Sequence, residues 1–123
     1  QAITLFADEE NYPIGYHCLI GRDRTGTMTI LLLGLLGVDE DTIIKEFMLT
    51  KNSVSGSEDG TSAPMLYAGY KNMMNKLDQY GSESDTIQKK IETYLLSIGV
   101  TQTEINSIRE SVIEIVNKQI IFV

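Results

Sequence analysis

The apolar positions of this chain recur with helical spacing over most of its length and predict about five helices. The predicted helices cover residues 27–36, 40–50, 64–79, 85–98 and a last segment that opens at residue 101. The first is apolar on nearly every side, which is typical of a helix buried in the middle of a core, whereas the later ones carry a single apolar stripe. The chain is therefore predicted to be mostly helical.

Local capping signals place the ends of these helices. Thr25 is predicted as the N-cap of the first helix, because a threonine hydroxyl can accept from free N–H groups there. Gly37 and Gly99 follow predicted helices and suit a left-handed C-terminal stop. Thr101 and Glu104 form a capping-box pattern at the start of the last helix.

Three segments lack helical spacing. Residues 14–16, Ile-Gly-Tyr, form a short apolar run that is predicted as one buried strand. Residues 52–63 are rich in Ser, Gly, Glu and Asp and are predicted as a loop. Residues 4–10 fit either the end of a helix or a loop. The expected order is thus one strand, a turn-rich stretch and about five helices, in a chain whose 123 residues suffice for a single domain.

Composition excludes several classes of protein. The net charge of −7 argues against a surface that binds nucleic acid or anionic membranes. Cys18 is the single cysteine and His17 the single histidine, so no disulfide, metal site or cofactor is expected. The longest apolar run, residues 30–38, is too short to span a bilayer. Residues 1–11 lack the basic start of a signal peptide, and a cytoplasmic and a secreted location both stay open.

The turn-rich stretch after the predicted strand carries the candidate chemistry. A loop between a strand and a helix N-terminus offers converging N–H groups and the positive end of the helix dipole. A cysteine in that field has a lowered pKa and becomes a nucleophilic thiolate, and an arginine fork can grip two phosphate oxygens. Cys18 and Arg24, six residues apart, supply both groups. The predicted phosphate-binding residues are Leu19, Ile20, Gly21, Arg22, Asp23 and Arg24.

Neighbouring residues support this interpretation. His17 is expected to order the loop through backbone hydrogen bonds, and Thr25 to place its hydroxyl near the Cys18 sulfur. Taken singly, a cysteine is usually a small buried hydrophobe and an arginine beside an aspartate is usually a surface pair. Taken together, five positions of the motif have a specified residue type, namely His17, Cys18, Gly21, Arg24 and Gly26. Because each type occurs at about 5–7%, all five would match the motif by chance roughly once in a million positions. The motif as a whole is therefore specific.

Residues 17–26, His-Cys-Leu-Ile-Gly-Arg-Asp-Arg-Thr-Gly, resemble the signature of the protein tyrosine phosphatase superfamily. The form Gly-(Lys/Arg)-Asp-Arg-Thr-Gly is similar to a narrower group, the bacterial-type tyrosine and phosphoinositide phosphatases. The flanking residues 12–14, 35–38 and 97–100 are also similar to that group. The resemblance implies an α/β fold of the tyrosine phosphatase type, here mostly helical with one strand before the phosphate loop.

The resemblance also implies roles for individual residues. Cys18 would form a cysteinyl-phosphate and Arg24 would bind the phosphoryl group. Asp23 occupies the position of a proposed proton donor to the leaving group, with ordering of the loop as the equal alternative. Arg22 stands where lysine is usual, a position linked to acidic substrates such as phosphoinositides, with a solvent-exposed charge as the alternative. No metal is implied.

The chain departs from the family pattern in one respect. The family places most strands of its sheet before the signature, yet only residues 1–16 precede His17 here, and no tryptophan is present for a Trp-Pro-Asp acid loop. We therefore expect residues 1–123 to be the C-terminal part of a tyrosine-phosphatase-like catalytic domain. A homodimer, or association with a missing N-terminal part, is the expectation that follows from the unpaired sheet edge.

The leading functional prediction is hydrolysis of phosphomonoesters through a cysteinyl-phosphate, as in protein tyrosine or dual-specificity phosphatases. The substrate would be a phosphorylated protein, small molecule or lipid, with no nucleic-acid partner. Two alternatives stay open, a phosphoinositide phosphatase and a catalytically silent module that binds phosphate. Arsenate reduction is disfavoured because Cys18 has no second redox cysteine beside it.

Overall fold

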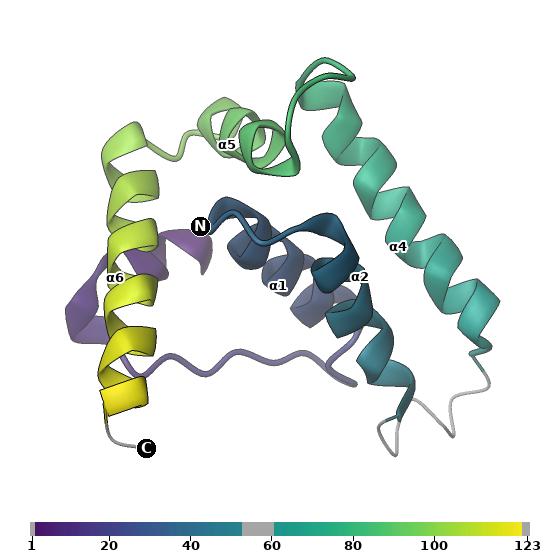
Figure 1. Cartoon of the computed structure of the whole chain (residues 1–123), viewed down its shortest axis with the longest axis horizontal. Helices are drawn as coiled ribbons and strands as arrows, with labels where there is room; N and C mark the ends of the chain where they lie inside the picture. Colours follow the sequence, from purple (N-terminus) through teal and green to yellow (C-terminus); the bar gives the residue numbers. More distant parts are fainter. Residues whose placement is uncertain (1, 53–60, 122–123) are drawn as a thin grey trace. The chain divides into compact units, whose positions relative to one another are not determined.

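The computed structural model describes residues 2–52 and 61–121, and these residues are mostly helical (Figure 1). The α-helices are α1 (Asp23–Leu35), α2 (Glu40–Met48), α4 (Ala63–Leu77), α5 (Ile87–Ser97) and α6 (Gln102–Ile121). Short 3-10 helices are η1 (Ala2–Ala7), η2 (Glu9–Asn11), η3 (Leu49–Asn52) and η4 (Asp78–Tyr80). The chain divides into two compact units, one of residues 16–94 and one of residues 1–15 with 95–123.

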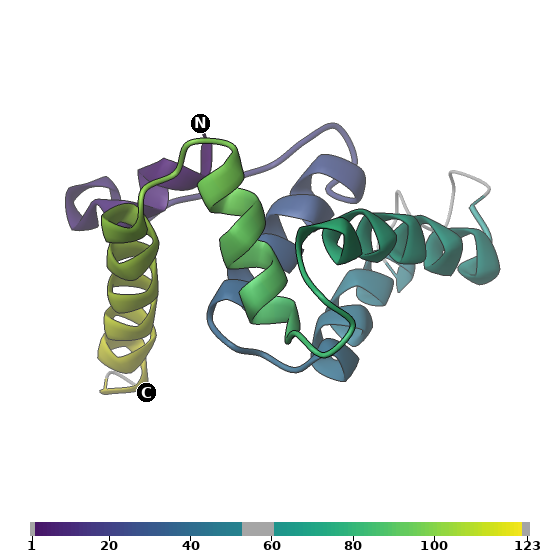
Figure 2. The same cartoon turned by 90° about the horizontal axis from the view of Figure 1, so that it is seen from above.

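In the unit of residues 16–94, α1 packs against α2, and α2 packs against α4 (Figures 1 and 2). The apolar sequence of α1 corresponds to a buried helix, since Ile30, Leu32 and Leu35 are all buried. These side chains remove apolar surface from water, at roughly 25 cal/mol per Å². The helix that begins at the candidate loop is therefore anchored in the core of its unit.

Two glycines let neighbouring side chains approach α1 closely. A Cβ atom at Gly26 would lie 2.7 Å from Cε2 of Phe47 on α2, and one at Gly34 would collide with Cδ1 of Ile91 on α5. Glycine inside a helix costs about 1 kcal/mol relative to alanine, so its presence here reflects this close packing. Gly26 thereby fixes the first turns of α1 against α2.

Helix ends follow the local signals in most places. Asp39 caps α2 by accepting from Thr42 N at 2.9 Å, and Ser62 caps α4 by accepting from Met65 N at 3.4 Å. Gly37 and Gly99 have φ angles of 85° and 94°, which confirms the predicted left-handed stops. The boundaries of α1, α2 and α5 differ from the predictions by up to four residues, as expected where ends depend on packing.

The other unit joins the two ends of the described chain, because α6 lies beside η1 in both views (Figures 1 and 2). The buried residues on these elements are Ile3 and Phe6 of η1 and Ile105 and Ile108 of α6. The predicted capping box of α6 is confirmed. Thr101 N donates to Glu104 Oε2 at 2.8 Å, and Glu104 N donates to Thr101 Oγ1 at 3.2 Å.

The predicted strand and the α/β class are not confirmed. Residues 14–16 have no regular secondary structure, and no strand occurs anywhere in residues 2–52 or 61–121. A strand needs a neighbouring strand to accept and donate its backbone hydrogen bonds, and the described residues offer none. Residues 4–10, left open between helix and loop, lie mainly in η1 and η2. Most of the predicted loop 52–63 lies outside the described residues.

None of the described helices combines the length and the apolar composition that crossing a lipid bilayer requires.

Candidate active site

The candidate site is the segment of residues 17–25, called here the Cys18 loop, which ends in the first turn of α1. Gly21 has a φ angle of 70°, a left-handed conformation that glycine adopts without strain. The backbone then enters α1, whose first helical hydrogen bond runs from Gly26 N to Arg22 O at 2.8 Å. The N–H groups of residues 23–25 therefore precede the helical ladder and are free to serve an anion.

Cys18 is partly exposed, and its surroundings lower the pKa of its thiol to about 6. The largest cause is the hydroxyl of Thr25, followed by the backbone N–H of Thr25, and the N–H groups of Ile20 and Gly21 add to it. Partial burial acts in the opposite direction. Because these donors stabilise negative charge on sulfur, the thiolate is the main form of Cys18 at pH 7, and the thiolate is the nucleophilic form of a cysteine.

Thr25 lies inside α1, so its predicted role as N-cap is wrong. Arg22 occupies the N-cap position, and its side chain makes no capping hydrogen bond. The Thr25 Oγ1 atom is buried and has no conventional hydrogen-bond partner among the described residues. The sulfur of Cys18 is the group with which this hydroxyl interacts, and the thiolate form is the better acceptor.

We expect Thr25→Val to raise the Cys18 pKa from about 6 toward the ordinary value near 8.5, because the substitution deletes the largest stabilising donor. The pH dependence of alkylation by iodoacetamide measures this value. A rise of one unit in the Cys18 pKa lowers the thiolate fraction at pH 6 by about fivefold. Thr25→Ser, which keeps the hydroxyl, is the matched control and should retain the low midpoint. An unchanged midpoint in Thr25→Val would contradict this account of the thiolate.

The segment before Cys18 is tied to α1 by hydroxyl groups. Thr29 Oγ1 donates to the Thr25 carbonyl at 3.0 Å and therefore accepts from the Tyr16 hydroxyl, which lies 2.9 Å away. His17 is exposed, and its Nδ1 lies 3.3 Å from the Cys18 carbonyl oxygen. Tyr16 and Thr29 were not predicted from the sequence, because neither stands out until the loop folds back on the helix.

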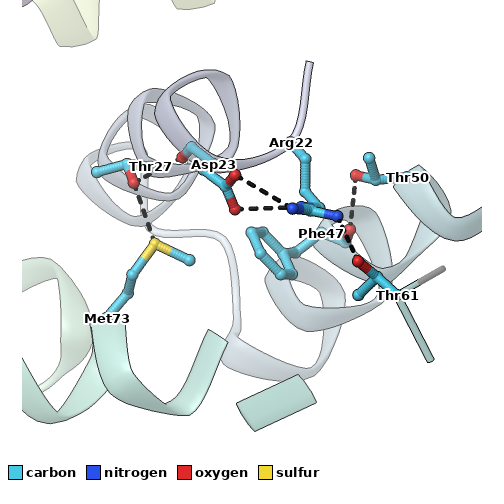
Figure 3. Close-up of polar contacts among 7 residues, drawn as sticks. All are labelled: Arg22, Asp23, Thr27, Phe47, Thr50, Thr61 and Met73. Atoms are coloured by element: carbon cyan, nitrogen blue, oxygen red, sulfur yellow. Dashed lines mark hydrogen bonds and ion pairs between the residues drawn. The ribbon is translucent and has the colours of Figure 1, made fainter. Parts of the chain in front are cut away.

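Arg22 and Asp23 form an ion pair beside the loop (Figure 3). Arg22 Nε lies 3.1 Å from Asp23 Oδ1, and a terminal nitrogen lies 3.4 Å from Oδ2. The other terminal nitrogen donates to Thr61 Oγ1 at 2.9 Å. The Arg22 side chain is only 19% exposed, against 72% for Asp23. Arg22 is therefore not the solvent-exposed charge that the sequence left as an alternative, and Thr61 is a partner that sequence reasoning missed.

Arg24 is exposed and lies on another side of α1 from Thr25. It lines a pocket of about 290 Å³ with Asp23 and Thr27 of α1 and with side chains of α2 and α4. The largest causes of the lowered pKa of Cys18 are the Thr25 hydroxyl and N–H group, not the Arg24 guanidinium. To bind an anion held by the loop, its guanidinium has to turn toward Cys18, which its long exposed side chain permits.

The remaining loop residues present backbone rather than side chains to the sulfur. Leu19 is 89% exposed, and Ile20 is half-buried. Among the described residues, no three His, Cys, Asp or Glu side chains gather closely enough to hold a metal ion. The chemistry available to this site is therefore that of a thiolate, backbone donors and arginine.

The Cys18 loop thus places a thiol of lowered pKa beside backbone N–H groups at the start of α1, with two arginines in the same loop. The chain belongs to the tyrosine phosphatase family, whose model matches residues 1–114. It is also similar to the triple specificity protein phosphatase PtpB of Mycobacterium tuberculosis, with 35% identity over 54 residues. That stretch covers 44% of this chain and 19% of the mycobacterial protein, so the chain spans a small part of this relative. No solved structure matches the chain.

Proposed function

We propose that this chain hydrolyses phosphomonoesters through a cysteinyl-phosphate on Cys18. The observation that carries the proposal is the convergence of the Thr25 hydroxyl and of backbone N–H groups on the Cys18 sulfur, which lowers the pKa of the thiol and favours the nucleophilic thiolate at neutral pH. Membership of the tyrosine phosphatase family supports phosphatase activity in general. The first line is electrostatic and local, whereas the second rests on most of the sequence, the Cys18 loop included.

In the first proposed step the Cys18 sulfur attacks phosphorus, the bond from phosphorus to the leaving oxygen breaks, and that oxygen takes up a proton from solvent. In the second step water attacks phosphorus and gives up a proton to solvent, the phosphorus–sulfur bond breaks, and inorganic phosphate and the thiolate are released. The N–H groups of residues 19–24 would hold the phosphoryl oxygens in both steps. Arg24 would turn in to bind two of these oxygens as negative charge builds up on them.

Asp23 has two proposed roles, proton donor to the leaving group and ordering of the loop. Both of its carboxylate oxygens face the guanidinium of Arg22. The Thr27 hydroxyl also donates to the Asp23 backbone carbonyl at 2.8 Å. These contacts favour the ordering role. The Asp23 carboxylate is also exposed to solvent. We therefore propose ordering of the loop as the main contribution of Asp23.

The proposed substrates are phosphorylated proteins, in keeping with the name of the mycobacterial relative. A small-molecule or lipid phosphomonoester, phosphoinositides included, is the alternative substrate class. Association with a second copy, or with a strand-bearing N-terminal part, stays a prediction that the described residues do not test. The assignment of residues 1–123 to the C-terminal part of a catalytic domain also stays a prediction.

Turnover of p-nitrophenyl phosphate tests the proposal directly. We expect hydrolysis that vanadate inhibits, and rapid denaturation during turnover should trap phosphate on Cys18. Because only the thiolate attacks, the acid limb of kcat/KM should fall away as pH drops through about 6, the pKa of Cys18. Binding of inorganic phosphate by calorimetry without any turnover would instead identify a silent phosphate-binding module.

A further inference from the structure

We propose that Arg22 is a positioning residue, which braces the Cys18 loop between Asp23 at the start of α1 and Thr61 ahead of α4 and does not bind substrate. The inference rests on the proposed function and departs from the role that the family resemblance implies for this position. The contacts that carry it are drawn in Figure 3. They join two segments, residues 22–23 at the start of α1 and Thr61, which lies 39 residues from Arg22 in the chain.

The first argument is that the guanidinium is already occupied. Its Nε and one terminal nitrogen face the two oxygens of Asp23, at 3.1 and 3.4 Å, and the other terminal nitrogen donates to Thr61. A phosphate would have to displace a carboxylate of the same charge sign to gain this fork. With 19% of its side chain exposed, Arg22 also offers little surface to an incoming dianion.

The second argument is geometric, because the partners of Arg22 belong to different elements. Asp23 is the first residue of α1, and Thr61 stands directly before Ser62, the N-cap of α4. A planar guanidinium can bond groups in different directions at once, whereas a lysine ammonium is a point charge on a flexible stem. Arginine in place of the lysine expected from the resemblance is therefore suited to bracing the loop.

The third argument is the contrast with Arg24. Both arginines lie within the same loop, but Arg24 is exposed, while Arg22 is mostly buried. A residue that binds substrate has to be accessible before the substrate arrives. A residue that braces the loop has to contact its protein partners already. The two side chains therefore divide the work, with Arg24 available for the phosphoryl group and Arg22 holding Asp23 and the start of α4.

Kinetics of Arg22→Lys and Thr61→Val test the proposal, with p-nitrophenyl phosphate as substrate and inorganic phosphate as a binding probe. Each variant breaks the contact between the loop and the residue ahead of α4, which is worth about the net stability of one ordinary hydrogen bond. We expect kcat to fall about three- to tenfold in each, with KM and the phosphate dissociation constant unchanged within roughly twofold. The double variant should be no worse than Arg22→Lys alone, because both remove one interaction.

Two matched controls accompany these variants. Thr61→Ser keeps the acceptor hydroxyl and should restore kcat. Thr42→Val removes a threonine hydroxyl that bonds Asp39 at 2.8 Å in α2, away from Arg22, and should leave kcat and phosphate affinity unchanged. A rise in KM and a loss of phosphate affinity of fivefold or more in Arg22→Lys, with Thr61→Val silent, would overturn the proposal and make Arg22 a substrate ligand.

Amide hydrogen exchange keeps the brace testable even without turnover. The amides of Met65 and Leu66 bond Ser62 at the start of α4, directly after Thr61. In Arg22→Lys and Thr61→Val these amides should exchange faster than in the wild-type chain, with phosphate affinity unchanged. Unchanged exchange in both variants would refute the brace, whereas absent wild-type turnover alone would refute only the proposed function.

Discussion

Cys18→Ser is expected to reduce hydrolysis of p-nitrophenyl phosphate by roughly 10⁴-fold or more, a loss in the range seen when an enzyme's nucleophile is removed. The loop donors lower the pKa of the thiol to about 6, but a serine hydroxyl starts so much higher that the same donors leave it protonated. Steady-state rates at pH 7 measure the loss. Trapping of phosphate on the chain during turnover should disappear with it.

Phosphate affinity is the control for this variant. The N–H groups that would hold the oxygens belong to the backbone, so Cys18→Ser should still bind inorganic phosphate with a dissociation constant close to that of the wild-type chain. Iodoacetamide should modify the wild-type chain once and leave the variant unmodified, since Cys18 is the single cysteine. Turnover above about 1% of the wild-type rate in Cys18→Ser would exclude a cysteinyl-phosphate, by the standard of nucleophile removal.

Arg24→Lys is expected to lower kcat by about 10²- to 10³-fold, the usual cost of removing one preorganised donor from a developing charge. Lysine keeps the positive charge but cannot bond two phosphoryl oxygens with one planar fork. Because these bonds strengthen as charge builds up in the transition state, kcat should fall far more than KM rises. Steady-state kinetics separate the two effects.

Two comparisons make the Arg24 result specific. Arg109→Lys on α6 carries the same chemical change in the other unit and should leave kcat unchanged. The alkylation midpoint of Cys18 should stay near 6 in Arg24→Lys, because the Thr25 hydroxyl and N–H group are the largest causes of this lowered pKa and lysine keeps the positive charge. A shifted midpoint, or a loss no larger than that of Arg22→Lys, would show that Arg24 does not have the proposed role.

The helices could be predicted from the sequence because their signals are local. The capping box of Thr101 and Glu104 and the stops at Gly37 and Gly99 involve residues within one turn of each other. Apolar spacing likewise predicted one apolar stripe on the helix at residues 64–79, since residues three and four apart share a side of a helix, and α4 buries Leu66, Tyr70, Met74 and Leu77. Only the boundaries shifted, where packing decides which turn is the last.

The strand prediction was not confirmed for the opposite reason. Residues 14–16 are apolar, but a strand is defined by bonds to a partner elsewhere in the chain, and apolar character does not supply the partner. The N-cap prediction for Thr25 failed because the same hydroxyl has two competing uses, capping the backbone or facing the Cys18 sulfur. Rules for helix capping do not decide between these two uses, because the choice depends on the position of the Cys18 sulfur.

The sequence by itself determined the helical segments, most of their caps and the spacing of Cys18 from Arg24, because each depends on residues close together in the chain. The sequence also predicted the Thr25 hydroxyl near the Cys18 sulfur. Tertiary structure alone decided that the N–H groups of Ile20 and Gly21 converge on the same sulfur, and that Arg22 is bonded to Thr61. A lowered pKa and an arginine brace are properties of distances between groups. Distances across 39 residues are set by the packing of α1, α2 and α4, which no local pattern encodes.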